Sequence, residues 1–68
     1  MKEFVLKDEY IELIKLLKLM GIAESGSFAK MLVEENKVFR NGKLETRKRA
    51  KLRKGDIIKV DKWTICIK

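Results

Sequence analysis

The stretch NGKLETRKRAKLRKGD, residues 41–56, begins and ends with a turn signal and carries most of the excess charge of the chain. From Lys43 to Lys54 there are seven basic residues and one acid, a net charge of +6. Asn41 and Gly42 both tolerate a positive φ and favour a tight hairpin, and Gly55-Asp56 is a second turn signal. We call residues 43–54 the basic arm. We expect it to be held against a small folded body and directed at a polyanion.

The rest of the chain is less basic than this segment. Residues 1–36 carry a net charge of −2 and residues 37–68 a net charge of +9. Such asymmetry points to a nucleic acid or another anionic surface as partner. The first residues contain no apolar run of signal-peptide length, and no apolar run in the chain reaches the roughly 20 residues that a membrane span needs. We therefore expect a cytoplasmic protein that does not bind membranes.

Length and composition restrict the function further. Sixty-eight residues make a single domain, 1–68, which leaves no room for a catalytic domain beside a binding one. There is no histidine, and Cys66 is the only cysteine, so we expect neither a metal site nor an internal disulfide. Free cysteines are usually buried, and we expect the same of Cys66. No cofactor or catalytic motif is present, so we expect no cofactor and no enzymatic activity.

Upstream of the basic arm, the pattern predicts one strand and two helices. The strand is expected over Glu3–Lys7. The first helix is expected over Glu9–Met20, with Asp8 as N-cap and Gly21 as the residue that ends it. The second is expected over Ser27–Glu35, with Ser25 as N-cap and Asn36 as its end. Because so few residues separate the helices, we expect them to pack as a hairpin.

Downstream, the pattern predicts a sheet. A hairpin over residues 38–46 turns at Asn41-Gly42, and two further strands cover residues 57–60 and 63–67. Good helix formers over residues 44–54 make a basic helix the competing interpretation. The apolar residues there do not form a helical stripe, which favours the sheet. The predicted fold class is α+β, a two-helix hairpin packed on a small antiparallel sheet.

The residues at the joints of this arrangement resemble the RNA-binding domain of ribosomal small-subunit protein S-four, known as the αL motif. The matching residues are Leu17, Gly21, Ser25, Ala29, Lys30, Leu32, Val38, Asn41, Gly42, Lys51, Gly55, Asp56, Ile58 and Val60. The pair Ser25-Gly26 and the run from Glu45 to Arg49 are similar to the stand-alone, single-domain bacterial branch. Two residues depart from the pattern: Gly26 stands where many relatives have an arginine that faces RNA, and Asn36 where a glycine is usual.

The resemblance implies a non-catalytic module that binds structured RNA, with ribosomal RNA as one candidate. Backbone N–H groups at the start of the second helix favour a phosphate, and the basic arm supplies further charge. The candidate RNA-binding residues are Ser25, Gly26, Ser27, Lys30, Arg40, Lys43, Arg47, Lys48, Arg49 and Lys51. No acid is interleaved in the run from Arg47 to Lys51 to pair its cations internally, which favours phosphate contact. We expect a monomer.

Two other functions stay open from the sequence. One is a general nucleic-acid or DNA binder, and the other is an interaction subunit that binds an acidic protein surface. Aromatic residues are few. Tyr10 or Phe39 could stack on a base, but core or half-buried packing is the simpler expectation for these two and for Phe28 and Trp63. Recognition by RNA shape and backbone is therefore favoured over base readout.

Overall fold

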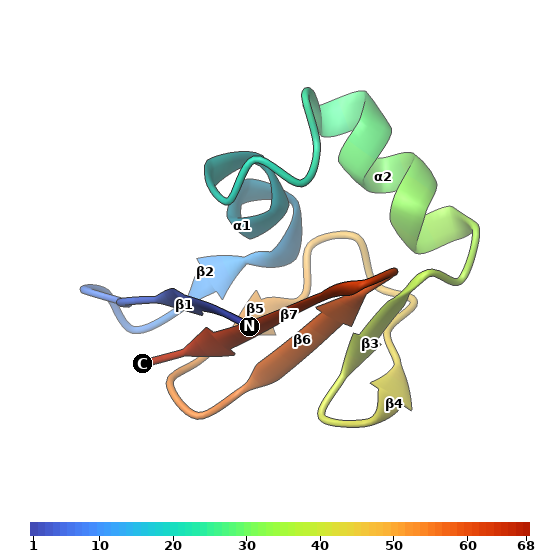
Figure 1. The fold of residues 1–68 in the computed structure, drawn as a ribbon. Coiled ribbons are helices and arrows are strands. Elements are labelled where there is room, and N and C mark those ends of the chain that lie inside the picture. Colours follow the sequence, from blue (N-terminus) through green and yellow to red (C-terminus); the bar gives the residue numbers. More distant parts are fainter.

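The computed structural model describes all residues, 1–68, as two short helices on one side of a sheet (Figure 1). The elements in chain order are β1 Lys2–Phe4, β2 Ile11–Glu12, α1 Leu13–Leu19, α2 Gly26–Glu34, β3 Val38–Arg40, β4 Lys43–Leu44, β5 Lys51–Leu52, β6 Ile57–Val60 and β7 Trp63–Ile67. The α+β class is as predicted, and no helix forms in the basic arm.

The main sheet has five strands in the order β1-β7-β6-β3-β4. β3, β4, β6 and β7 pair antiparallel, as predicted, through the Asn41-Gly42 turn and a second turn at Asp61. Asn41 (φ 52°), Gly42 (φ 84°) and Asp61 (φ 55°) all take the left-handed conformation that such tight turns need. β1 pairs parallel to β7, with Glu3 opposite Cys66, so the sheet is mixed. A strand from the far end of the chain thus completes the edge.

The first helix is shorter than predicted. α1 begins at Leu13, with Glu12 as N-cap and no side-chain cap, so the predicted start at Glu9 with Asp8 as cap is wrong. Ile11 and Glu12 instead pair antiparallel with Leu52 and Lys51, forming the two-stranded sheet β2-β5. Backbone pairing with a distant segment has overridden the local helix signal. This pairing fixes one end of the basic arm directly beneath α1.

The other three helix boundaries predicted from capping residues agree with the structure. The Ser25 hydroxyl accepts a hydrogen bond from the Phe28 N–H at 3.2 Å, which is an N-cap for α2. Gly21 (φ 75°) and Asn36 (φ 60°) take the left-handed conformation after α1 and α2. Asn36, where a glycine is usual, therefore adopts the backbone conformation that a glycine would take at this position.

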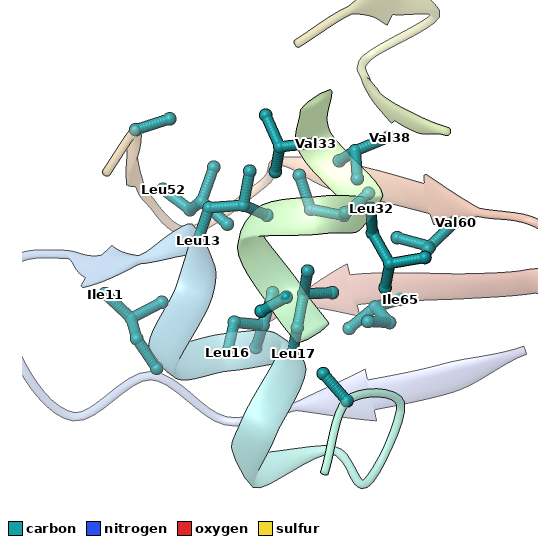
Figure 2. Packing of buried hydrophobic residues seen from close by; sticks show 14 of the residues in the cluster. Ile11, Leu13, Leu16, Leu17, Leu32, Val33, Val38, Leu52, Val60 and Ile65 are labelled. Atoms are coloured by element: carbon teal, nitrogen blue, oxygen red, sulfur yellow. The ribbon is translucent and has the colours of Figure 1, made fainter. Parts of the chain in front are cut away.

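One apolar cluster joins the helices to both sheets. Sixteen buried hydrophobic residues form it, among them Leu13, Leu16 and Leu17 of α1. Figure 2 shows these leucines facing Leu32 and Val33 of α2 and the inward side chains of β3, β6 and β7. Because both helices and the β5 strand of the arm contribute to this one core, the positions of the arm and of the helix start are fixed relative to each other.

Some apolar side chains lie outside this core. Tyr10, Phe28, Phe39 and Trp63 each expose between 37% and 40% of their surface, so none of them is a core residue. Cys66 is half-buried, on the outward side of β7 between buried Ile65 and Ile67, so the expectation of a buried thiol is wrong. In β7 the buried Ile65 and Ile67 alternate with the half-buried Thr64 and Cys66.

Candidate nucleic-acid interface

The first candidate contact is the start of α2. The N–H groups of Gly26 and Ser27 precede the first intrahelical bond, which Ala29 donates to the Ser25 carbonyl at 3.0 Å, so the helix itself cannot satisfy them. Ser25 and Ser27 are exposed. A side chain at Gly26 would meet only Ile14 Cγ2, at 3.9 Å. The site therefore presents free donors, with space for a larger residue at position 26.

Lys30 lies one turn further along α2. It is exposed, and no carboxylate lies within 4.0 Å of its ammonium group, since it takes part in none of the six ion pairs of the chain. Its neighbour Ala29 is fully buried. Lys30 therefore stands on the solvent side of the helix with its charge unpaired.

Arg40 is the least free of the candidate cations. Its guanidinium donates to Asp56 Oδ2 at 2.8 and 3.1 Å and to the Lys51 carbonyl at 3.0 Å, and it lies 3.7 Å from Glu45 Oε1. The side chains of Arg40, Asp56 and Glu45 expose only 21%, 14% and 7% of their surface. Arg40 thus ties together β3, both ends of the arm and the turn that follows it.

Asp56 and Asn41 complete this anchor. Asp56 accepts hydrogen bonds from the Arg53 N–H at 2.8 Å and from Asn41 Nδ2 at 3.0 Å. Asn41 Oδ1 in turn accepts from the Ile57 N–H at 2.8 Å. The two turn signals that bound the arm in the sequence are therefore joined directly to each other in space.

Glu45 is the single acid of the arm and the one buried charged residue of the protein, 6% exposed. It accepts hydrogen bonds from the Arg47 N–H at 3.0 Å and from Arg47 Nε at 3.2 Å. Burial acts to raise the pKa of Glu45, but the Arg47 hydrogen bonds and the charges of Arg47 and Arg40 outweigh it and hold that pKa below its ordinary value of 4.5. Glu45 therefore stays charged, and its carboxylate holds Arg47 of the arm close to Arg40.

The pKa of Asp56 is lowered for similar reasons. Burial acts to raise it, but hydrogen bonds from the Arg53 N–H, Asn41 and Arg40, with the Arg40 charge, bring the pKa below its ordinary value of 3.8. Two carboxylates beneath a basic segment are thus held in the charged form. They balance the cations that anchor the arm.

Three candidate cations of the hairpin and arm have no carboxylate partner. Lys43, Arg49 and Lys51 are exposed and take part in no ion pair. Two others do: Arg47 pairs with Glu45, and Lys48 Nζ lies 2.6 Å from Glu34 Oε2 at the end of α2. The expectation that no acid pairs the arm cations is therefore wrong for Arg47 and Lys48. Glu34 approaches from another element, which sequence spacing could not show.

Arg53 and Tyr10 also lie together in this region, although neither was among the residues expected from the sequence to bind RNA phosphates. Lys51 Nζ lies 5.0 Å and Arg53 Cζ 5.9 Å from the centre of the Tyr10 ring, both within cation–π range. Arg53 also donates to the Glu9 carbonyl at 3.4 Å. The pairing of β2 with β5 creates this contact. In the sequence, only the density of basic residues in the arm pointed to this contact.

The hairpin edge is hollowed. A depression of about 430 Å³ lies among Arg40, Asn41, Lys43 and the loop from Leu44 to Arg47. The arm follows this edge and passes beneath the C-terminal end of α2, where the Lys48–Glu34 pair joins them. Polar and basic groups therefore surround a concave surface next to the free cations.

Neither helix combines the length and the apolar character that crossing a bilayer requires.

Comparisons with known proteins identify the family. The sequence model of the S4 domain family matches residues 4–68. The Escherichia coli (strain K12) protein named "Putative RNA-binding protein YbcJ" is 44% identical over 52 residues, which cover 76% of this chain and 74% of YbcJ. YbcJ of Shigella flexneri matches with the same identity and coverage.

A solved structure agrees with the fold. The solution structure of Escherichia coli YbcJ, described as revealing an αL motif involved in RNA-binding, superposes with a TM-score of 0.76 at 38% identity, covering 98% of this chain and 86% of that chain. The αL resemblance drawn from Ser25, Asn41-Gly42 and Gly55-Asp56 is thus confirmed. The chain belongs to the S4 domain family.

Proposed function

We propose that this protein is a non-catalytic RNA-binding protein that recognises structured RNA through its phosphates, with ribosomal RNA as a candidate target. The observation that carries the proposal is the set of exposed cations without an ion-pair partner, Lys30, Lys43, Arg49 and Lys51, together with the free N–H groups of Gly26 and Ser27 at the start of α2. The names of its relatives support RNA as the ligand. We place its action in the cytoplasm, as a single-domain monomer.

The candidate residues take different roles in this proposal. Lys30, Lys43, Arg49 and Lys51 contact phosphates directly, and Ser25, Gly26 and Ser27 hold a phosphate at the helix start. Arg47 and Lys48 are partly neutralised by Glu45 and Glu34 and contribute less. Arg40 positions the hairpin and arm rather than contacting RNA, because its Nε and Nη2 donors are already used.

Crosslinking in cells, followed by sequencing of the bound RNA, tests the proposal. The variant Arg49→Gln with Lys51→Gln removes two unpaired charges from the arm. The control Lys7→Gln with Lys15→Gln removes two exposed charges that lie outside the arm, in the loop before β2 and in α1.

We expect one or a few structured RNAs to be enriched with the wild type and the control and lost with the arm variant. Recovery of DNA and RNA alike would favour a general nucleic-acid binder. Recovery of neither, with tight capture of one acidic protein, would favour the interaction subunit. Equal enrichment by both variants would contradict the proposed contacts.

A further inference from the structure

The face of the main sheet that points away from the helices is uncovered and partly apolar. The strand register places Phe39 opposite Leu44 on one side and Lys59 on the other, with Thr64 opposite Lys59. Directly opposed residues share a face. Phe39, Leu44 and Ile57 expose 39%, 44% and 45% of their surface, and the residues that alternate with them in β3 and β6 are buried, apart from the half-buried Arg40. Figure 1 shows both helices on the other side.

This outer face is hollowed and basic. A depression of about 540 Å³ lies over Phe39 and Ile57, with Lys37, Lys59 and Asp61 among its lining residues. Lys59 has no carboxylate partner within 4.0 Å, and Lys37 has only Glu35, at 3.8 Å, with both side chains about half exposed. Such exposed pairs are weak and exchange partners readily. An aromatic ring on an open sheet between two lysines is complementary to a base and its flanking phosphates.

The outer hollow adjoins the candidate interface at the hairpin turn. Gly42 lines the outer hollow, and Asn41 and Lys43 line the depression at the hairpin edge. Only the tip of the hairpin separates the two. A strand that leaves an RNA stem bound at the arm can therefore pass over the Asn41-Gly42 turn onto the sheet.

We propose that the outer face of the sheet binds a single-stranded nucleotide segment adjoining the structured RNA, with one base stacked on Phe39 and its phosphates against Lys37 and Lys59. This inference rests on the proposed function and extends it to unpaired RNA. Purines stack more strongly than pyrimidines, so the site prefers adenine to uracil, a preference set by stacking and not by hydrogen-bond readout.

An NMR titration with oligoadenylate and with oligouridylate of equal length maps the site on the wild type. We expect oligoadenylate to bind more tightly and to shift the amide resonances of residues 37–42 and 57–64. Phe39→Thr replaces the ring with a β-branched side chain that strands favour, and we expect about ten-fold weaker oligoadenylate binding. Phe39→Tyr keeps the ring and retains the affinity.

A stem-loop RNA without single-stranded ends separates this inference from the proposed function. It is expected to bind the wild type and Phe39→Thr equally. Failure of the stem-loop to bind the wild type contradicts the proposed function. Stem-loop binding combined with oligoadenylate shifts confined to the arm, or with unchanged oligoadenylate affinity in Phe39→Thr, overturns only the sheet-face site.

Sedimentation of the free protein tests whether a second copy of the chain, and not RNA, covers this apolar face. Dimerisation of the wild type that Phe39→Thr abolishes would assign the face to a second copy of the chain and overturn the proposal. We expect both proteins to sediment as monomers. The wild-type shift map needs no variant, so it decides the question even if Phe39→Thr fails to fold.

Discussion

Two groups of cations around the hairpin and arm are alike in sequence and differ in what they contact. The anchoring group, Arg40 and Arg47, is held by the carboxylates of Asp56 and Glu45. The free group, Lys43, Arg49 and Lys51, has no carboxylate partner and faces solvent. The difference shows that positive charge here serves two purposes: the first group builds the surface, and the second is available to a ligand. Substitutions in one group should therefore affect stability and in the other affinity.

The largest expected effect is on stability, from Arg40→Gln. Glutamine leaves the carboxylate of Asp56, 14% exposed, without its guanidinium partner, and leaves that of Glu45, 7% exposed, with Arg47 alone. Removing one partner of a buried ion pair is strongly destabilising. Because Arg40 itself is partly exposed, we expect a loss of about 2–3 kcal/mol in the free energy of unfolding, measured by urea denaturation.

Arg49→Gln is the matched control in the free group. A substitution at an exposed, unpaired position changes the free energy of unfolding by less than about 0.5 kcal/mol. Equal destabilisation by the two variants would show that the division into anchoring and free cations is wrong.

The next largest effect is expected from acid, which should weaken the contacts of Glu45 and Asp56 with Arg40. Folding lowers the pKa of both Glu45 and Asp56, so the unfolded chain binds more protons than the folded chain as the pH falls below their ordinary values of 4.5 and 3.8. The stability they contribute is fully present above that range and is lost as the pH falls through the lowered pKa values. Urea midpoints measured between about pH 6 and about pH 3 should fall towards acid.

The variant Arg40→Gln is the comparison for this pH series. Without the guanidinium the pKa of each carboxyl lies nearer its ordinary value, so the fall towards acid should be shallower. A slope identical to that of the wild type would mean that Arg40 does not hold these carboxylates in the charged form.

Prediction from the sequence succeeded where a feature is local and failed where a distant segment intervenes. Ser25, Gly21, Asn36 and the Asn41-Gly42 turn are set by cap and turn chemistry, and the structure confirms all of them. The predicted start of α1 was wrong because Ile11 pairs with Leu52, forty-one residues further along the sequence. The parallel pairing of β1 with β7 likewise joins the two ends of the chain.

The candidate site shows the same limit. The density of the basic arm and the family resemblance both pointed to this region. Which of its cations are paired and which are free could not be predicted. Arg40 pairs with Asp56, sixteen residues away, and Lys48 pairs with Glu34 on α2. Ion pairs between separate elements leave no spacing pattern in the sequence.

Adding an unpaired cation is the complementary test of the comparison between anchoring and free cations. Gly26 has an ordinary helical φ, and a Cβ there meets only Ile14 Cγ2 at 3.9 Å, so Gly26→Arg should be accommodated. The substitution also removes a helix-destabilising glycine. With the positive end of α2 beside it, we expect roughly five-fold tighter binding of a structured RNA at low salt, measured by fluorescence anisotropy. Gly26→Gln adds bulk without charge and should leave the affinity nearly unchanged.

The smallest effect should come from Glu34→Gln, which converts a paired cation into a free one. The substitution releases Lys48 from its 2.6 Å ion pair and removes a negative charge near the arm. We expect RNA affinity to rise by about two-fold, with little change in stability because the pair is exposed. Glu24→Gln, an exposed acid outside every ion pair, is the control. Weaker RNA binding by Glu34→Gln would mean that the pair itself orients Lys48 for the ligand.

The salt dependence of RNA affinity tests the central claim most directly. Four to five neutralised phosphates predict a slope of log affinity against log salt of roughly −4 for the wild type. Removing Arg49 and Lys51 as glutamines should bring the slope to roughly −2, while Lys7→Gln with Lys15→Gln should leave it at roughly −4. The same slope in all three proteins, or a wild-type slope near zero, would contradict phosphate recognition by the free cations.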